Sequence, residues 1–183
     1  MKKSMMMIVA GIALAATTQA ASINWSSGLR AVTWLDTLTT TAEGTQYYLV
    51  LDSYVAGITT AIKEGSFSAA TAGVLDVGTS TGTKGAVSER VATSALLQVG
   101  GTVYDYRLLV FDSYAGVDYF QFSAARPEMA YIPGDPVYGE VRKVAFGATH
   151  FSTENWEAVP EPTSLALLAL GVAAIGLRRK FRK

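Results

Sequence analysis

Two uncharged apolar stretches near the ends of the chain restrict where a domain can fold. One runs from Met5 to Ala16, and the other covers residues 163–177. Between them, residues 21–162 hold all 15 acidic residues of the chain but only 8 of its 15 basic ones, a formal charge of −7. A segment of this length can bury a sizeable core, so we expect one acidic domain between the two stretches.

The N-terminal stretch has the pattern of a secretory signal peptide. Residues 1–20 carry Lys2 and Lys3 after the first methionine, continue through an apolar region and end with small residues at Thr18 and Ala20. Signal peptidase requires such small residues before the bond it cleaves, so we expect cleavage between Ala20 and Ala21. A signal anchor that stays uncleaved is the alternative.

The C-terminal stretch is expected to be a short transmembrane helix. As a helix, residues 163–177 would extend about 22 Å, less than the ~30 Å hydrocarbon core of a bilayer. Long basic side chains lengthen such a span by reaching the interface, and they stay on the cytoplasmic side. The expected anchor includes Leu165, Leu177, Arg178, Arg179, Lys180, Arg182 and Lys183. The alternative is a buried helix of a soluble domain.

Just before this stretch stand Pro160, Glu161 and Pro162. A proline fixes its own φ and disfavours helix at the residue before it, so the segment is kept extended. An extended, accessible peptide is what a processing enzyme needs in order to bind. The alternative is a rigid spacer that is not processed.

Together, the sequence VPEPTSLALLALGVAAIGLRRKFRK (159–183) resembles a PEP-CTERM sorting signal, found on exported proteins of Gram-negative bacteria. The resemblance implies a precursor held in the inner membrane, processed near the motif by exosortase, with its mature form at the cell surface or outside the cell. The chain then has three parts: a signal peptide (1–20), an extracytoplasmic domain (21–158) and the sorting signal (159–183).

The composition narrows what the domain does. Its acidic charge disfavours nucleic acid as a partner, because such binding depends on basic surface. The chain has no cysteine, which removes thiol catalysis and thiolate metal sites, and its one histidine, His150, limits imidazole chemistry. We expect a protein that is not an enzyme and needs no cofactor.

Local patterns predict an antiparallel β-sandwich with one short α-helix. The helix is expected over residues 54–64, with Ser53 as N-cap and Gly65 as a left-handed C-cap. In the strand at 102–112, alternation places Tyr104, Tyr106, Leu108 and Val110 on one face. The other strands are expected at 45–52, 118–123 and 141–152 and, from weaker patterns, at 22–26, 30–35, 73–77 and 86–97.

A near repeat gives one candidate metal site. The sequence LVLDSY (49–54) recurs as LVFDSY (109–114), and Asp52 and Asp112 would ligate Ca²⁺ if neighbouring strands brought them together. The alternative is that Asp-Ser ends each strand because both side chains bond nearby backbone groups in turns.

Three functions remain open on the sequence. The first is a structural protein of the cell surface or extracellular matrix, associated with biofilm or exopolysaccharide. The second is a carbohydrate- or calcium-binding surface module, in which some of the nine tyrosines and Trp25, Trp34 and Trp156 form an exposed platform for sugar rings. The third is an enzyme that uses His150 or a pair of carboxylates.

Overall fold

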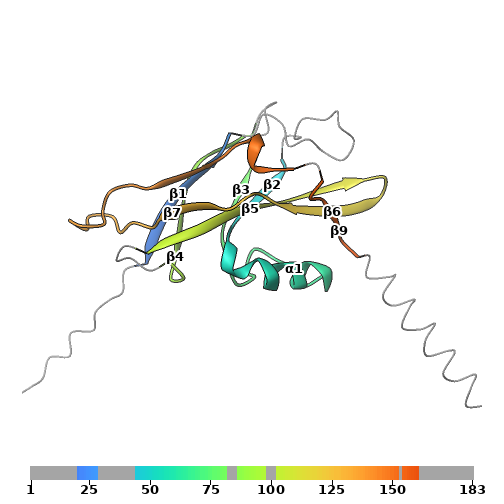
Figure 1. Ribbon diagram of the computed structural model, residues 1–183, viewed down its shortest axis with the longest axis horizontal. Coiled ribbons are helices and arrows are strands. Elements are labelled where there is room, and N and C mark those ends of the chain that lie inside the picture. Colours follow the sequence, from blue (N-terminus) through green and yellow to red (C-terminus); the bar gives the residue numbers. More distant parts are fainter. Residues whose placement is uncertain (1–19, 29–43, 82–85, 98–101, 153, 161–183) are drawn as a thin grey trace, which may run out of the picture.

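The computed structural model describes residues 20–28, 44–81, 86–97, 102–152 and 154–160. This part of the chain is mainly β, with two sheets and one short α-helix (Figure 1). The strands are β1 (Ala21–Ser27), β2 (Gln46–Leu51), β3 (Val74–Thr79), β4 (Val87–Ser94), β5 (Val103–Tyr114), β6 (Val117–Phe122), β7 (Arg126–Met129), β8 (Lys143–Phe146) and β9 (Glu157–Ala158). The helix is α1 (Val55–Lys63), and 3₁₀ turns occupy Asp52–Tyr54 and Ala148–His150.

The smaller sheet has the strand order β4-β1-β8, and the larger has the order β3-β2-β5-β6-β9, with β7 also paired to β5. All pairs between these strands are antiparallel except β1 and β8, which are parallel. The expectation of a wholly antiparallel architecture was therefore wrong for this pair. Parallel neighbours require a long connection rather than a hairpin, and most of the chain lies between β1 and β8.

Two apolar clusters hold the layers together. The first lies between the sheets and combines residues such as Ile23 of β1 with Leu49 of β2 and Leu108 of β5. The second lies between the larger sheet and α1, where Ile58 and Ile62 of the helix pack with partners that include Leu109 of β5 and Phe120 of β6. The larger sheet is thus buried on both of its faces.

Strand β5 shows how the sequence encodes this arrangement. Tyr106, Leu108 and Val110 face the first cluster with Tyr104 beside them, as the alternation predicts. Leu109 faces the opposite side and is equally buried, because α1 covers it. A strand covered on both faces carries apolar residues at successive positions, which explains the run Leu108-Leu109-Val110.

A polar link joins the two sheets. The buried Trp25 of β1 donates its indole N–H to Asp76 of β3 at 2.9 Å, and Arg90 of β4 binds the same carboxylate through two nitrogens at 2.8 and 3.1 Å. Partial burial would raise the pKa of Asp76, but the hydrogen bonds from Arg90 and Trp25 outweigh it, and the pKa lies below its ordinary value. The folded state therefore favours the charged carboxylate.

The helix prediction was correct in place but wrong at its start. Ser53 lies in the 3₁₀ turn, and the residue before α1 is Tyr54, which makes no side-chain capping bond. At the other end Gly65 has φ of +69°, as predicted for a left-handed C-cap. Here the amide of Ser66 donates to the carbonyl of Ala61 at 2.9 Å.

The strand predictions were confirmed except in the C-terminal third. The segment 141–152 is a strand only over β8, and the 3₁₀ turn that contains His150 follows it. The short strands β7 and β9 were not predicted. The strand expected at 30–35 lies outside the described residues.

Gly78 on β3 gives a test of how closely the sheets approach. A Cβ atom there would lie 2.6 Å from Val87 and 2.7 Å from Trp25, so we expect Gly78→Ala to lower the free energy of unfolding by about 1–3 kcal/mol. Gly57 in α1 is the control, because a Cβ would meet nothing within 4 Å and alanine should stabilise the helix by about 0.5–1 kcal/mol. Urea denaturation of the 21–160 fragment measures both. Equal effects of the two substitutions would contradict the packing described.

Candidate functional site

The segment that leads into the Pro-Glu-Pro motif is bound to the edge of the larger sheet. Strand β9 pairs with β6, with Ala158 opposite Tyr119 and Glu157 opposite Phe120. The amide of Val159 then donates to the carbonyl of Asp118 at 2.7 Å. Pro160 has no N–H and cannot continue such bonding. The backbone pairing of the domain therefore ends at Val159, immediately before the motif begins at Pro160.

Helix α1 also contacts this segment. Lys63 at the end of α1 forms an ion pair of 3.0 Å with Glu157. The side chain of Val159 packs on the second apolar cluster, which contains Ile62. Backbone pairing, an ion pair and apolar contact thus act together on residues 157–159.

A cavity of about 570 Å³ lies beside this segment. One part of its lining is apolar and includes two aromatic rings, Phe67 and Phe111, whose centroids are 5.3 Å apart. The other part is polar and comes from the β5–β6 hairpin. The lining residues are Ile62, Gly65, Phe67, Phe111, Asp112, Ser113, Asp118 and Val159.

Hydrogen bonds order the polar part of the lining. The amide of Ser113 donates to a carboxylate oxygen of Asp112 at 2.8 Å, and the hydroxyl of Ser113 donates to Asp118. Two carboxylates therefore lie at one side of a cavity whose floor is apolar. This combination suits a cationic group carried on an apolar stem.

The near repeat does not form a shared metal site. Strands β2 and β5 are neighbours, but they are antiparallel, with Leu51 opposite Tyr106 and Tyr47 opposite Val110. Asp52 follows one end of β2, and Asp112 lies beyond the other end, about 20 Å away at the ordinary rise of a strand. The hypothesis that Asp52 and Asp112 ligate one Ca²⁺ ion was therefore wrong.

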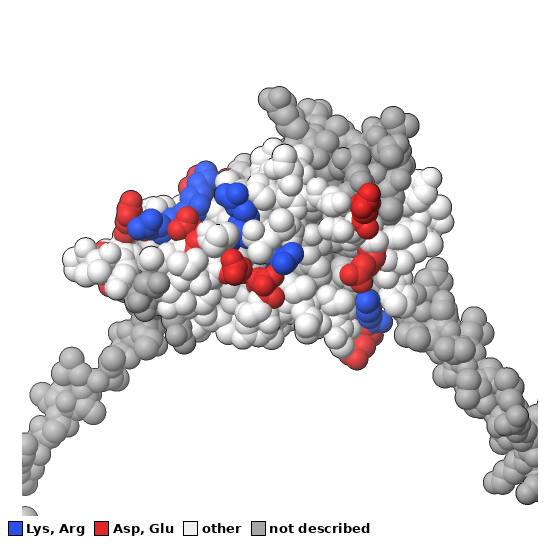
Figure 2. Space-filling view, viewed as in Figure 1, with Lys and Arg blue, Asp and Glu red and all other residues white. Residues whose placement is uncertain are grey.

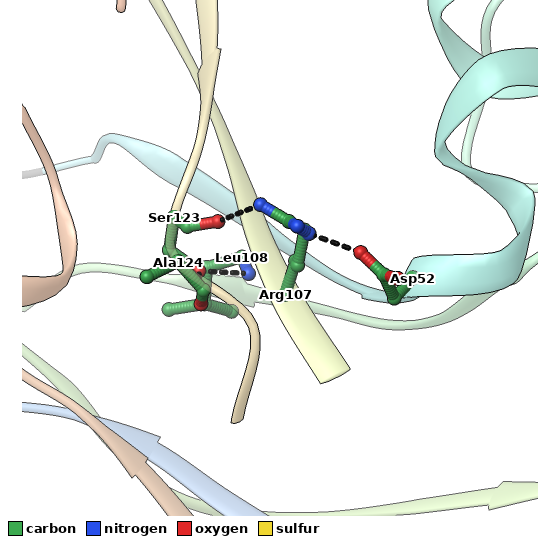
Figure 3. Close-up of polar contacts among 5 residues, drawn as sticks. All are labelled: Asp52, Arg107, Leu108, Ser123 and Ala124. Atoms are coloured by element: carbon green, nitrogen blue, oxygen red, sulfur yellow. Dashed lines mark hydrogen bonds and ion pairs between the residues drawn. The ribbon is translucent and has the colours of Figure 1, made fainter. Parts of the chain in front are cut away.

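Asp52 has a different role, shown in Figure 3. Its carboxylate pairs with Arg107 of β5, and Arg107 also donates to the carbonyl of Ser123 at 2.8 Å. The hydroxyl of Ser123 accepts from the amide of Leu108 at 2.9 Å and donates to the carbonyl of Ala124 at 2.9 Å. This network connects the segment that begins α1 with the end of β6, so it is structural.

His150 is not placed beside a nucleophile by any contact that the structure records. Its Nδ1 accepts a hydrogen bond from the amide of Gly147 at 2.8 Å, and its Nε2 lies 3.1 Å from Arg126. Within the described ranges, no group of three or more His, Asp or Glu side chains is arranged to hold a metal ion. The absence of enzymatic activity stays a prediction.

Several predicted site residues lie outside the described part of the chain. They are Glu161, Pro162, Leu165, Leu177, Arg178, Arg179, Lys180, Arg182 and Lys183, together with residues 1–19 of the expected signal peptide. At the expected cleavage position, Ala20 is partly exposed and Ala21 begins β1, with only 1% of its surface exposed.

Over the segments that the structure describes, no helix is both long and apolar enough to cross a membrane.

Comparison with known families identifies the C-terminal segment. Residues 158–180 match the family model of the PEP-CTERM protein-sorting motif, as the sequence predicts. The chain therefore carries a PEP-CTERM sorting motif, and this signal implies export and sorting through the membrane-associated exosortase. No curated protein and no solved structure matches the chain.

Sequence reasoning missed strand β9 and the cavity beside it. Glu-Ala has weak strand preference, so nothing local marks residues 157–158 as a strand. The cavity joins α1, the β5–β6 hairpin and Val159, which lie far apart in the sequence. No local sequence signal marks contacts between residues that lie so far apart.

The Lys63–Glu157 pair tests whether α1 helps to hold β9. We expect Glu157→Lys to raise the amide exchange rate of Val159 roughly threefold, since an exposed ion pair contributes about 0.2–1 kcal/mol. Adding Lys63→Glu should return the rate towards its original value, because opposite charges face each other again. NMR hydrogen exchange gives both rates. If the reversal changed nothing, the ion pair would have no part in anchoring β9.

Proposed function

We propose that this chain is an exported structural protein of the cell surface or the extracellular matrix, cut by exosortase near Pro160 and without enzymatic activity of its own. The observation that carries the proposal is the PEP-CTERM match at residues 158–180, which begins inside β9. The domain is then the cargo, and the C-terminal segment is its sorting signal. Association with biofilm or exopolysaccharide is part of the proposal.

The geometry at the motif supports this division of labour. Residues 157–159 are held on the sheet. The prolines of the motif would disfavour a helix there, which would leave the peptide available for an enzyme to bind. The apolar stretch 163–177 and the basic residues after it would supply insertion and orientation in the inner membrane. Recognition by the enzyme and insertion into the membrane would therefore use different parts of the chain.

The position of Ala21 supports removal of the signal peptide before folding. Ala21 begins β1, which is the middle strand of the smaller sheet and is paired on both sides. A peptidase binds its substrate as an extended segment that is not paired in a sheet. Cleavage after Ala20 would therefore occur before β1 pairs with β4 and β8. The mature domain would then begin with its central strand.

The aromatic residues favour a structural role over a sugar-binding platform. Trp25, Tyr47 and Tyr106 are fully buried, and Trp156 packs against the first apolar cluster. Trp34 lies outside the described residues. We propose that the two sheets form a β-sandwich that uses these rings as its core.

On the face seen in Figure 2, Lys and Arg side chains lie beside Asp and Glu rather than in one continuous basic area. The ion pairs of the described residues include Lys143 with Glu89 and Arg142 with Glu140. Nucleic acid, which requires continuous basic surface, is not among the partners that we propose.

The sorting role is tested by separating recognition from anchoring. Pro160→Ala combined with Glu161→Ala should abolish processing, so that full-length precursor accumulates in the inner membrane. Deletion of residues 163–183 should instead release soluble protein, because the anchor is lost. Immunoblots of membrane and soluble fractions distinguish the two.

The control is the same pair of substitutions at Pro127 and Glu128, a Pro-Glu sequence in β7 that lies outside the motif. This variant should be processed like the parent chain. If the motif variant were also cut normally, Pro-Glu-Pro would be only a spacer and the proposal would be wrong.

A further inference from the structure

The cavity beside Val159 is lined by residues of the second apolar cluster and of the β5–β6 hairpin, and nothing described so far occupies it. We propose that it is a docking site on the cargo domain for a basic side chain, Lys or Arg, of the enzyme that processes the motif. This inference rests on the proposed function. It adds that the enzyme recognises the folded domain as well as the Pro-Glu-Pro peptide.

The first argument is position. Val159 lines the cavity and lies within the matched segment 158–180, and the next residue is Pro160. The 2.7 Å bond from Val159 to Asp118 holds this segment on the sheet. Three extended residues span at most about 11 Å, so an enzyme that binds 160–162 meets the surface around the cavity.

The second argument is charge. Asp112 and Asp118 lie at one side of the cavity, and Asp118 is exposed. Lys63, which follows the lining residue Ile62, is already paired with Glu157 at 3.0 Å. An exposed carboxylate beside an extended substrate peptide attracts a cationic partner and repels an anionic lipid headgroup.

The third argument is the apolar floor. Ile62, Phe67, Phe111 and Val159 would contact the aliphatic stem of a Lys or Arg side chain while the carboxylates bind its charged end. A cation within about 6 Å of either phenyl ring would gain further attraction. A volume of about 570 Å³ exceeds one side chain and fits a short loop that presents it.

The test measures the rate of processing in cells. Asp112→Asn combined with Asp118→Asn removes both charges but keeps the Oδ1 atoms that accept hydrogen bonds from Ser113. We expect pulse-chase labelling of the full chain to show processing slowed about threefold to tenfold, since rim charges govern the rate of association.

The matched control is Asp105→Asn with Glu128→Gln. It removes two charges near the opposite end of β5, where Tyr104 pairs with Glu128 and Asp105 with Pro127. Processing of this variant should match the parent chain. Thermal unfolding of both double variants checks that each is folded, and if the Asp112 and Asp118 variant is not, the single change Asp118→Asn at an exposed position takes its place.

A second readout is the salt dependence of processing in isolated membranes. Raising the salt from about 0.05 to 0.3 M should slow processing of the parent chain and have a smaller effect on the variant without the two carboxylates. Equal rates and equal salt dependence would overturn the docking site, provided that the Pro160 and Glu161 variant is still blocked. Normal cutting of that motif variant would instead refute the proposed function itself.

Discussion

The contact between Trp25 and Asp76 joins the two sheets, and the position of β1 depends on it. The indole ring fills the core between the sheets, while its N–H donates to a carboxylate that Arg90 also binds. Gly78 leaves room for the ring, because any Cβ there would overlap it. One aromatic side chain therefore links β1 of the smaller sheet to β3 of the larger sheet across the core.

The larger sheet then determines where the C-terminal segment lies. Because the smaller sheet covers one of its faces and α1 covers the other, its interior strands are buried on both sides. Its edge at β6 accepts β9, and α1 contributes Lys63 to the same place. The sorting motif consequently begins directly after a strand that is paired with the folded domain.

The sequence predicted correctly those features that depend on residues close together in the chain. Alternation in β5 identified its inward face, and Gly65 identified the end of α1, because both depend on residues near in sequence. Asp52 was misread as a metal ligand because its partner, Arg107, lies 55 positions away. The parallel pairing of β1 with β8 and the existence of β9 also depend on distant contacts. The PEP-CTERM signal was recognisable because its motif, apolar stretch and basic tail follow one another directly in the sequence.

The central claim is that the chain is exported cargo that is cut near its sorting motif. Intact mass spectrometry of the protein recovered from outside the inner membrane tests it most directly, since one mass reports both ends. The account predicts a chain that begins at Ala21 and lacks the basic residues 178–183. A mass equal to that of the full 183 residues would contradict it.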